Sequence, residues 1–213
     1  MRTDMLQELE RIVRLAGGMV REAHDIEQVT TEKNGAADLV TKYDVAVQGF
    51  LKRELLELLP EADFFGEEGE HAALTRPWTF IVDPIDGTTN FVRRLHYSNI
   101  SVALAHDGQV EYAVVYDPFA DQLFSAQKDC GAFCSGLPIH VSDKDMAHAV
   151  FLCGSTIYDR SLTEQNFSLL RQLYDRGLDY RRFGAAALDL CQVAAGRVEL
   201  FYECRLSPWD FAA

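Results

Sequence analysis

Two aspartates stand three positions apart in the run Asp83-Pro84-Ile85-Asp86-Gly87-Thr88-Thr89-Asn90-Phe91. The apolar segment before them, Trp78-Thr79-Phe80-Ile81-Val82, has the pattern of a buried strand. Clustered carboxylates supply the oxygen ligands that hard divalent cations require, and Pro84 keeps the chain off the regular strand ladder, so that these groups can converge. A helix starting at Gly87-Thr88-Thr89 would offer free N–H groups to an anion. The run therefore predicts metal-assisted phosphate chemistry, although Asp-Pro and Asp-Gly are also common in ordinary turns.

Two other acidic residues follow short apolar segments. Glu67 comes after Phe64-Phe65-Gly66, and Asp210 comes after Pro208-Trp209. If all these segments are strands of one sheet, their ends meet at one edge, where open α/β sheets bind ligands. Four carboxylates can bind two or three Mg²⁺ ions, and a phosphate can complete the coordination.

The elements that must position these acids can be predicted from hydrophobic periodicity. A helix is expected over residues 4–25, and a second helix has its apolar face at Val45, Val47, Phe50, Leu51, Leu55 and Leu58 and ends at Pro60. Further strands are expected at 99–105, 110–116, 122–126, 149–153 and 198–202, and further helices at 161–174 and 184–195. Helices and strands alternate with hairpins between them, so the fold class is α/β or α+β with a mixed sheet.

Composition limits the classes of function. The 213 residues suit one large domain or two closely packed subdomains, and the net charge of −13 disfavours binding to nucleic acids or anionic membranes. No apolar run reaches membrane-spanning length, and no signal peptide is recognisable. The five cysteines are odd in number and irregularly spaced, which favours a reducing, cytoplasmic location.

The chain resembles the inositol monophosphatase family over nearly all of its length. Three segments are similar to the family's three signatures, in the family's order: Gly66-Glu67-Glu68, the run 83–91, and Trp209-Asp210-Phe211-Ala212-Ala213. The segment 38–44 resembles its N-terminal Asp-Leu-Val-Thr segment. The resemblance implies a layered α/β/α/β/α sandwich, dependence on Mg²⁺ with two or three ions per site, sensitivity to lithium, hydrolysis of small phosphate monoesters, and a homodimer.

The resemblance also implies a set of metal ligands. Glu67, Asp83 and the carbonyl of Ile85 would hold the first ion. Asp83, Asp86 and Asp210 would hold the second, and Glu67 would help with a third.

Roles in catalysis and phosphate binding follow from the same resemblance. Thr88, together with Asp44, would orient the attacking water beside Glu67, and no covalent intermediate would form. The backbone N–H groups of Gly87 and Thr88 would cradle the phosphate, and Lys33 would lie on a loop near the metals.

The alcohol part of the substrate would contact Asp86, Gly154, Ser155, Ala186 and Glu203. Inositol monophosphate or a related sugar or polyol phosphate is the favoured substrate, because Thr88-Thr89-Asn90 differs from the Thr-Lys typical of related nucleotide phosphatases. Fructose bisphosphate and histidinol phosphate remain alternatives. A haloacid dehalogenase-type mechanism is disfavoured because its two acids are two positions apart, not three. A non-catalytic role as a partner of the bacterial transcription machinery is the alternative from a different class.

One domain is expected, with its two halves meeting near residue 140. Residues 1–213 would form a single domain, with the metal site in an N-terminal half, about 1–140, and an incomplete C-terminal half, 141–213. The family continues beyond the position of Ala213, so we expect Asp210 to be poorly supported and the second metal ion to bind more weakly than the first.

Overall fold

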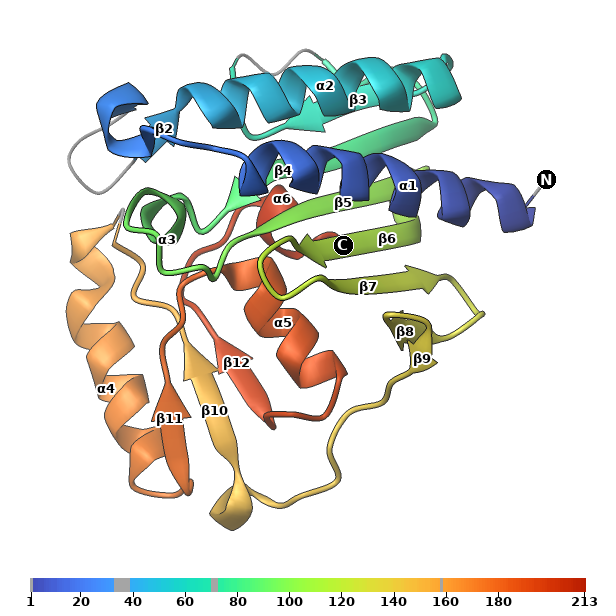
Figure 1. Ribbon diagram of the computed structural model, residues 1–213. Coiled ribbons are helices and arrows are strands. Elements are labelled where there is room, and N and C mark those ends of the chain that lie inside the picture. Colours follow the sequence, from blue (N-terminus) through green and yellow to red (C-terminus); the bar gives the residue numbers. More distant parts are fainter. Residues whose placement is uncertain (1, 33–38, 70–72, 158) are drawn as a thin grey trace.

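A seven-stranded mixed sheet is the largest element of the computed structural model, which describes residues 2–32, 39–69, 73–157 and 159–213 (Figure 1). β3 and β4 are parallel, and every other neighbouring pair in this sheet is antiparallel. In spatial order the strands are β3 (Asp63–Gly66), β4 (Trp78–Asp86), β5 (Asn99–His106), β6 (Gln109–Asp117), β7 (Gln122–Gln127), β8 (Ala132–Cys134) and β9 (Leu137–Pro138).

Two helices cover one face of this sheet, α1 (Arg2–Arg21) and α2 (Lys42–Leu58). The main apolar core lies between them and the sheet, where Leu9, Leu51 and Phe80 are fully buried. A two-stranded ribbon, β1 (Thr30–Glu32) with β2 (Leu39–Thr41), leads into α2.

The start of α2 is fixed by a capping box. The Thr41 side chain accepts hydrogen bonds from the N–H groups of Tyr43 and Asp44, and the Asp44 carboxylate accepts one from Thr41 N at 2.8 Å. Asp44 occupies the buried stripe of the helix together with Val47, and Val45 therefore faces outward. The prediction that Val45 belongs to the apolar face is wrong, since 59% of it is exposed.

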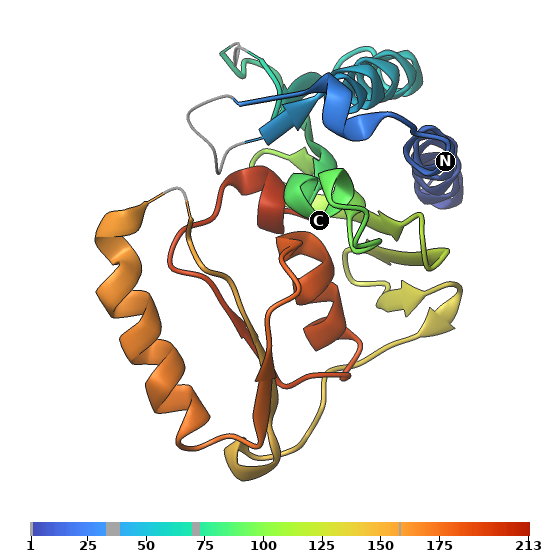
Figure 2. The same ribbon diagram turned by 60° about the vertical axis from the view of Figure 1, so that its left-hand side comes forward.

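In the second half of the chain, the described residues add a smaller sheet and three α-helices. Its central strand β10 (Val150–Cys153) is parallel to both neighbours, β11 (Asp179–Arg181) and β12 (Leu200–Tyr202). Figure 2 shows α5 (Ala186–Ala194) between the two sheets and α4 (Thr163–Tyr174) on the outer side of the small sheet. The short helix α6 (Pro208–Phe211) contacts β4 and β5. The layers follow the order α/β/α/β/α, which confirms the predicted architecture.

The structure differs from the predicted secondary structure at the ends of some elements and in short elements that were not predicted. α1 ends at Arg21, and β4 continues through the acidic motif to Asp86. The strands β1, β2, β8, β9 and β11 and the helix α6 were not predicted, because two to four residues show no measurable periodicity. Among the helices of the described residues, none has the length and apolar character needed to cross a membrane.

Adjacent glycines in α1 allow a test of how closely this helix packs on the sheet. Gly17 faces the buried Tyr116 ring, and a methyl group there would overlap the ring, whereas the corresponding position of Gly18 is open. We expect Gly17→Ala to destabilise the fold by about 1–3 kcal/mol through overpacking. Gly18→Ala should stabilise it by about 0.5–1 kcal/mol through helix propensity. Urea unfolding of both variants measures the difference, and similar effects of the two changes would contradict this packing.

Candidate metal centre

A bulge at the end of β4 brings its two aspartates together. In the pairing with β5, Asp83 lies opposite Ser101 and Asp86 lies opposite Asn99, so β4 has one residue more than β5 over this interval. Side chains three apart on a regular strand point to opposite faces. The extra residue in the bulge reverses that alternation. This agrees with the prediction that Pro84 holds the chain off the ladder and lets the carboxylates converge.

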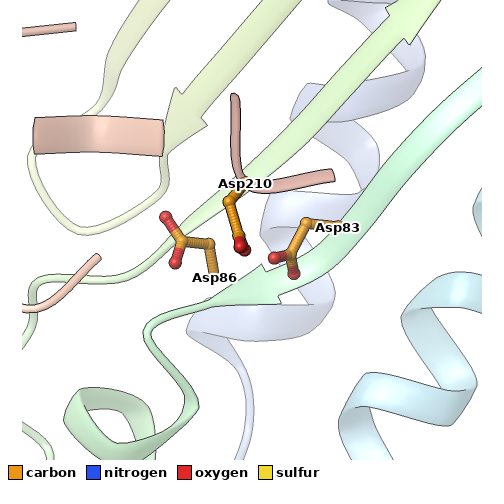
Figure 3. Close-up of side chains that lie close together, drawn as sticks. All are labelled: Asp83, Asp86 and Asp210. Atoms are coloured by element: carbon orange, nitrogen blue, oxygen red, sulfur yellow. The ribbon is translucent and has the colours of Figure 1, made fainter. Parts of the chain in front are cut away.

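Three carboxylates converge at this point. Asp83, Asp86 and Asp210 each offer an oxygen within 4.8 Å of the others, and Figure 3 shows Asp210 reaching toward the two aspartates of β4. Glu67 follows β3, which is parallel to β4 with Gly66 opposite Val82, and its N–H donates to the Val82 carbonyl at 3.0 Å. The expectation that Glu67 and Asp83 share one edge of the sheet is confirmed.

Burial and mutual repulsion raise the pKa values of these acids. The pKa of Asp83 lies well above its usual range because the side chain is buried, with further contributions from Glu67, Asp86 and Asp210. Burial raises the pKa of Asp210 to about 7, and Asp86 and Glu67 add to the shift. The pKa of Asp86 is also raised by burial, against the opposing effect of its hydrogen bonds. Such a cluster is electrostatically costly without a cation.

Asp210 lies on a helix, so the prediction that it follows a strand is wrong. Pro208 opens α6, and Ser207 and Asp210 form a capping box in which Ser207 N donates to the Asp210 carboxylate at 2.6 Å. Two contacts anchor the neighbouring Trp209: its carbonyl accepts from Ser101 Oγ at 3.2 Å, and its ring lies 5.4 Å from that of Phe65. Asp210 thus has more support than its place in the sequence suggests.

Thr88 and Asp44 meet at the start of α3 (Thr88–Val92). Thr88 Oγ1 lies 3.2 Å from the Ile85 carbonyl and 3.5 Å from Asp44 Oδ1. The other oxygen of Asp44 is held by Thr41, through Thr41 N at 2.8 Å and Thr41 Oγ1 at 2.6 Å. Burial raises the pKa of Asp44 to about 6. The capping box of α2 therefore fixes a carboxylate that faces the Thr88 hydroxyl.

Gly87 makes the sharp turn between β4 and α3. Its φ of 82° favours glycine, and a methyl group there would come within 3.0 Å of Ala185 Cβ and 3.2 Å of the Gly184 carbonyl. Ser98 Oγ donates to the Gly87 carbonyl at 3.0 Å. The N–H groups at the beginning of α3 have no partners within the helix, so they are available to an anion.

The carboxylate of Asp86 links the metal cluster to α5. It accepts hydrogen bonds from Ala186 N at 3.1 Å, from Ala187 N at 2.8 Å and from Asn99 Nδ2 at 2.7 Å. α5 begins at Ala186, and its N-cap residue Ala185 has no capping side chain. Asp86 therefore supplies the negative charge that the N-terminus of this helix favours.

An open cavity of about 870 Å³ joins these features. All the predicted site residues line it except Asp44 and Lys33: Glu67, Asp83, Ile85, Asp86, Gly87, Thr88, Gly154, Ser155, Ala186, Glu203 and Asp210. Asp44 lies behind Thr88, and Lys33 lies outside the described residues.

Sequence reasoning missed several residues of the cavity wall, among them Thr156, Arg182, Asp189 and Arg205. Asp189 is buried, accepts a hydrogen bond from Tyr97 Oη at 2.8 Å, and has its pKa raised by burial to about 7. No motif contains these residues, and only the contact between the two halves of the chain brings them to the metal cluster.

The donor set fits a hard divalent cation. All of its side-chain ligands are carboxylates, and the Ile85 carbonyl lies in the same cavity wall. Burial raises the pKa of Asp83 and repulsion from the neighbouring carboxylates adds to it, and a bound Mg²⁺ would relieve that repulsion.

Comparison with known proteins identifies the family. Residues 1–213 match the inositol monophosphatase family, and the chain belongs to it. It is 34% identical over 212 residues to the Nus factor SuhB of Escherichia coli strain K12, a match that covers 98% of this chain and 79% of that protein. It is also 34% identical to the inositol-1-monophosphatase of Rhizobium meliloti, with 100% of this chain and 81% of that protein covered.

A solved structure supports the same assignment. The crystal structure of the suhB protein from Bartonella henselae superposes with a TM-score of 0.92 at 32% identity, covering 98% of this chain and 81% of that one. The fold and the family are therefore both established for this chain.

The metal assignment predicts a stability change that can be measured without substrate. A ligand that binds only the folded state stabilises it, so saturating Mg²⁺ at pH 8 should raise the thermal unfolding midpoint by several degrees. Asp83→Asn should abolish that increase. The pKa of Asp83 is raised in the folded state, so its ionisation lowers the free energy of unfolding as pH rises. Without Mg²⁺, Asp83→Asn should therefore be at least as stable as the wild type at pH 8.

The matched control is Asp107→Asn, at an exposed turn with a φ of 49° that asparagine also tolerates. It should retain the full response to Mg²⁺. The same Mg²⁺ response in Asp83→Asn as in wild type would show that the ion binds elsewhere.

Proposed function

We propose that this chain hydrolyses a small phosphate monoester in the presence of Mg²⁺, through direct attack by a metal-activated water. Inositol monophosphate or a related sugar or polyol phosphate is the proposed substrate. The proposal rests on one observation. A single cavity brings together the carboxylate cluster, the Thr88 hydroxyl that faces Asp44, and the N-terminus of α3. Kinship with the inositol-1-monophosphatase of Rhizobium meliloti supports the choice of substrate.

In this proposal Glu67, Asp83 and the Ile85 carbonyl would hold the first ion. Asp83, Asp86 and Asp210 would hold the second, and Glu67 would help with a third. Bound Mg²⁺ would supply Lewis-acid polarisation of the phosphoryl group and activation of water.

The residues around the metals orient the reactants. In this proposal the Thr88 hydroxyl, which lies 3.5 Å from Asp44 Oδ1 and 3.2 Å from the Ile85 carbonyl, passes its proton to Asp44 while one of its lone pairs accepts a proton from the attacking water. Asp44 serves this role when ionised, above its pKa of about 6. The N–H groups of Gly87 and Thr88 bind the phosphate oxygens.

The alcohol part of the substrate would lie against the second half of the chain. Glu203 is held there by Thr156 N, which donates to it at 2.9 Å, and its carboxylate packs against Gly154, where a methyl group would overlap it. With Ser155, Ala186 and Asp86, this wall offers polar groups to the hydroxyls of a polyol. Lithium sensitivity, a homodimer and a cytoplasmic location belong to the same proposal and stay predictions.

The proposal is tested by phosphate release over a panel of monoesters that includes inositol 1-phosphate. Release should require Mg²⁺, fall by several orders of magnitude in Asp83→Asn, and persist in Asp107→Asn. Titration of lithium against Mg²⁺ in the same assay tests the predicted inhibition. Undiminished release by Asp83→Asn would refute the assignment of the site.

Thr88→Ala separates the two functions assigned to this residue. Removing the hydroxyl should lower kcat about 10²–10⁴-fold, the usual contribution of general acid–base catalysis. KM should change little, because the backbone N–H that serves the phosphate is kept. Thr88→Ser retains a hydroxyl and should recover much of the rate. A higher KM with unchanged kcat would instead mean that the hydroxyl contributes uniform binding.

A second candidate function is a non-catalytic partnership with the bacterial transcription machinery. The observation in its favour is the name Nus factor SuhB carried by the Escherichia coli relative. A wild-type chain that binds Mg²⁺ yet releases no phosphate from any monoester in the panel would favour this alternative.

A further inference from the structure

Asn99 is a buried side chain beside the metal centre that the proposed hydrolysis does not use. Only 1% of it is exposed. Its Nδ2 donates to Asp86 Oδ2 at 2.7 Å, whereas its Oδ1 accepts no hydrogen bond from the described residues. A buried acceptor without a partner destabilises a fold. An apolar side chain would avoid that loss, so the amide contributes here through its bond to Asp86.

The bulge in β4 brings Asn99 to this carboxylate. The pairing of β4 with β5 is interrupted after Asp83 and resumes with Asp86 directly opposite Asn99. Directly opposed residues of an antiparallel pair have Cβ atoms about 4.5–5.5 Å apart on the same face. A side chain as short as that of Asn99 therefore reaches Asp86, and the neighbouring strand supplies a neutral donor to a metal ligand.

The hydrogen bonds of Asp86 leave its two oxygens in different states. Oδ2 accepts from Ala187 N at 2.8 Å and from Asn99 Nδ2 at 2.7 Å, and Oδ1 accepts from Ala186 N at 3.1 Å. An ionised carboxylate has about four lone-pair sites. Both sites of Oδ2 are therefore occupied, and one site of Oδ1 remains for a cation. Of these three donors, Asn99 is the one that comes from a side chain.

A single available oxygen suits Mg²⁺ better than Ca²⁺. Mg²⁺ requires near-octahedral geometry with short bonds and keeps several waters, while Ca²⁺ takes roughly six to eight oxygens and often binds both oxygens of one carboxylate. With Oδ2 occupied, Asp86 cannot bind an ion through both oxygens. Without the bond from Asn99, one site of Oδ2 would be released, and the larger ion would gain a ligand.

We propose that Asn99 makes the metal centre selective for Mg²⁺ over Ca²⁺ by holding Asp86 as a ligand through one oxygen. Asn99 is a positioning residue, because it acts through Asp86. The inference rests on the proposed function only in taking Asp86 as a metal ligand, and it concerns which divalent cation the cluster accepts. Selectivity between these two ions depends on the number and flexibility of the ligands, and the bond from Asn99 limits both at Asp86.

The test titrates the metal-free protein with Mg²⁺ or Ca²⁺ alone by calorimetry, with no substrate present. The binding step that Asp86→Asn abolishes identifies the ion held by Asp86. Asn99→Leu has nearly the same size and no donor, and it should weaken Mg²⁺ binding at this step about tenfold, as when a group that orients a metal ligand is removed. The affinity for Ca²⁺ should stay the same or rise, because the released oxygen compensates. The ratio of the two affinities should therefore fall.

Thr79→Val is the matched control. Thr79 is also a buried polar residue of the large sheet, but it lies near the other end of β4, opposite Ala105. This change should leave both affinities unaltered. Asn99→Ala removes the same donor without adding bulk. It should lower the ratio as well, and it replaces Asn99→Leu if far-UV circular dichroism shows that the leucine variant does not fold.

Other outcomes would overturn the inference in distinguishable ways. Equal losses for both ions, or no change for either, would show that Asn99 does not choose the ion. A wild type that binds Ca²⁺ as tightly as Mg²⁺ at this step would refute the inference and leave the proposed hydrolysis intact. A wild type that binds neither ion would overturn both the inference and the metal assignment. Selectivity that depends on Asn99 in a chain that releases no phosphate would support the inference and refute the proposed function alone.

Discussion

The hydrogen bonds that converge on the Asp86 carboxylate hold the site and the fold together. One partner, Asn99, belongs to the large sheet, while the two N–H groups of Ala186 and Ala187 open a helix of the second half. The N-terminus of that helix needs acceptors and favours negative charge, and Asp86 provides both at the place where a metal ion would bind. Asn90 strengthens the junction, because its Nδ2 donates to the carbonyls of Tyr97 and Phe183 at 2.9 and 2.8 Å.

The same location creates an electrostatic conflict. Asp83 and Asp86 are almost fully buried, and Asp210 lies beside them, so their negative charges repel one another in a medium that screens poorly. Uncharged side chains would pack there at lower cost. Burial of several carboxylates is understandable when a cation completes the cluster, and a raised pKa at such a cluster is typical of functional sites.

The two walls of the cavity have different characters. One wall is built by β3, β4 and α3, whose acids and N–H groups suit metal ions and a phosphate. The opposite wall is built from the strand ends and loops of the small sheet and from the start of α5, and it offers hydroxyl, carboxylate and guanidinium groups. Arg182 and Arg205 belong to this second wall.

Local spacing and hydrophobic periodicity by themselves predicted the metal motif and a mixed-sheet α/β or α+β class, and the resemblance carried by the three signature segments implied the family and the layered architecture. The sequence also predicted that Glu67 and Asp83 share a sheet edge, since both follow apolar strands. Only the tertiary structure placed Asp210 on a capped helix, made Asp86 the acceptor for α5, and brought Arg182 and Asp189 into the cavity. The physical reason is the distance along the chain: Asp86 and Ala186 are separated by 100 residues, and no local pattern records a contact that the packing of two sheets creates.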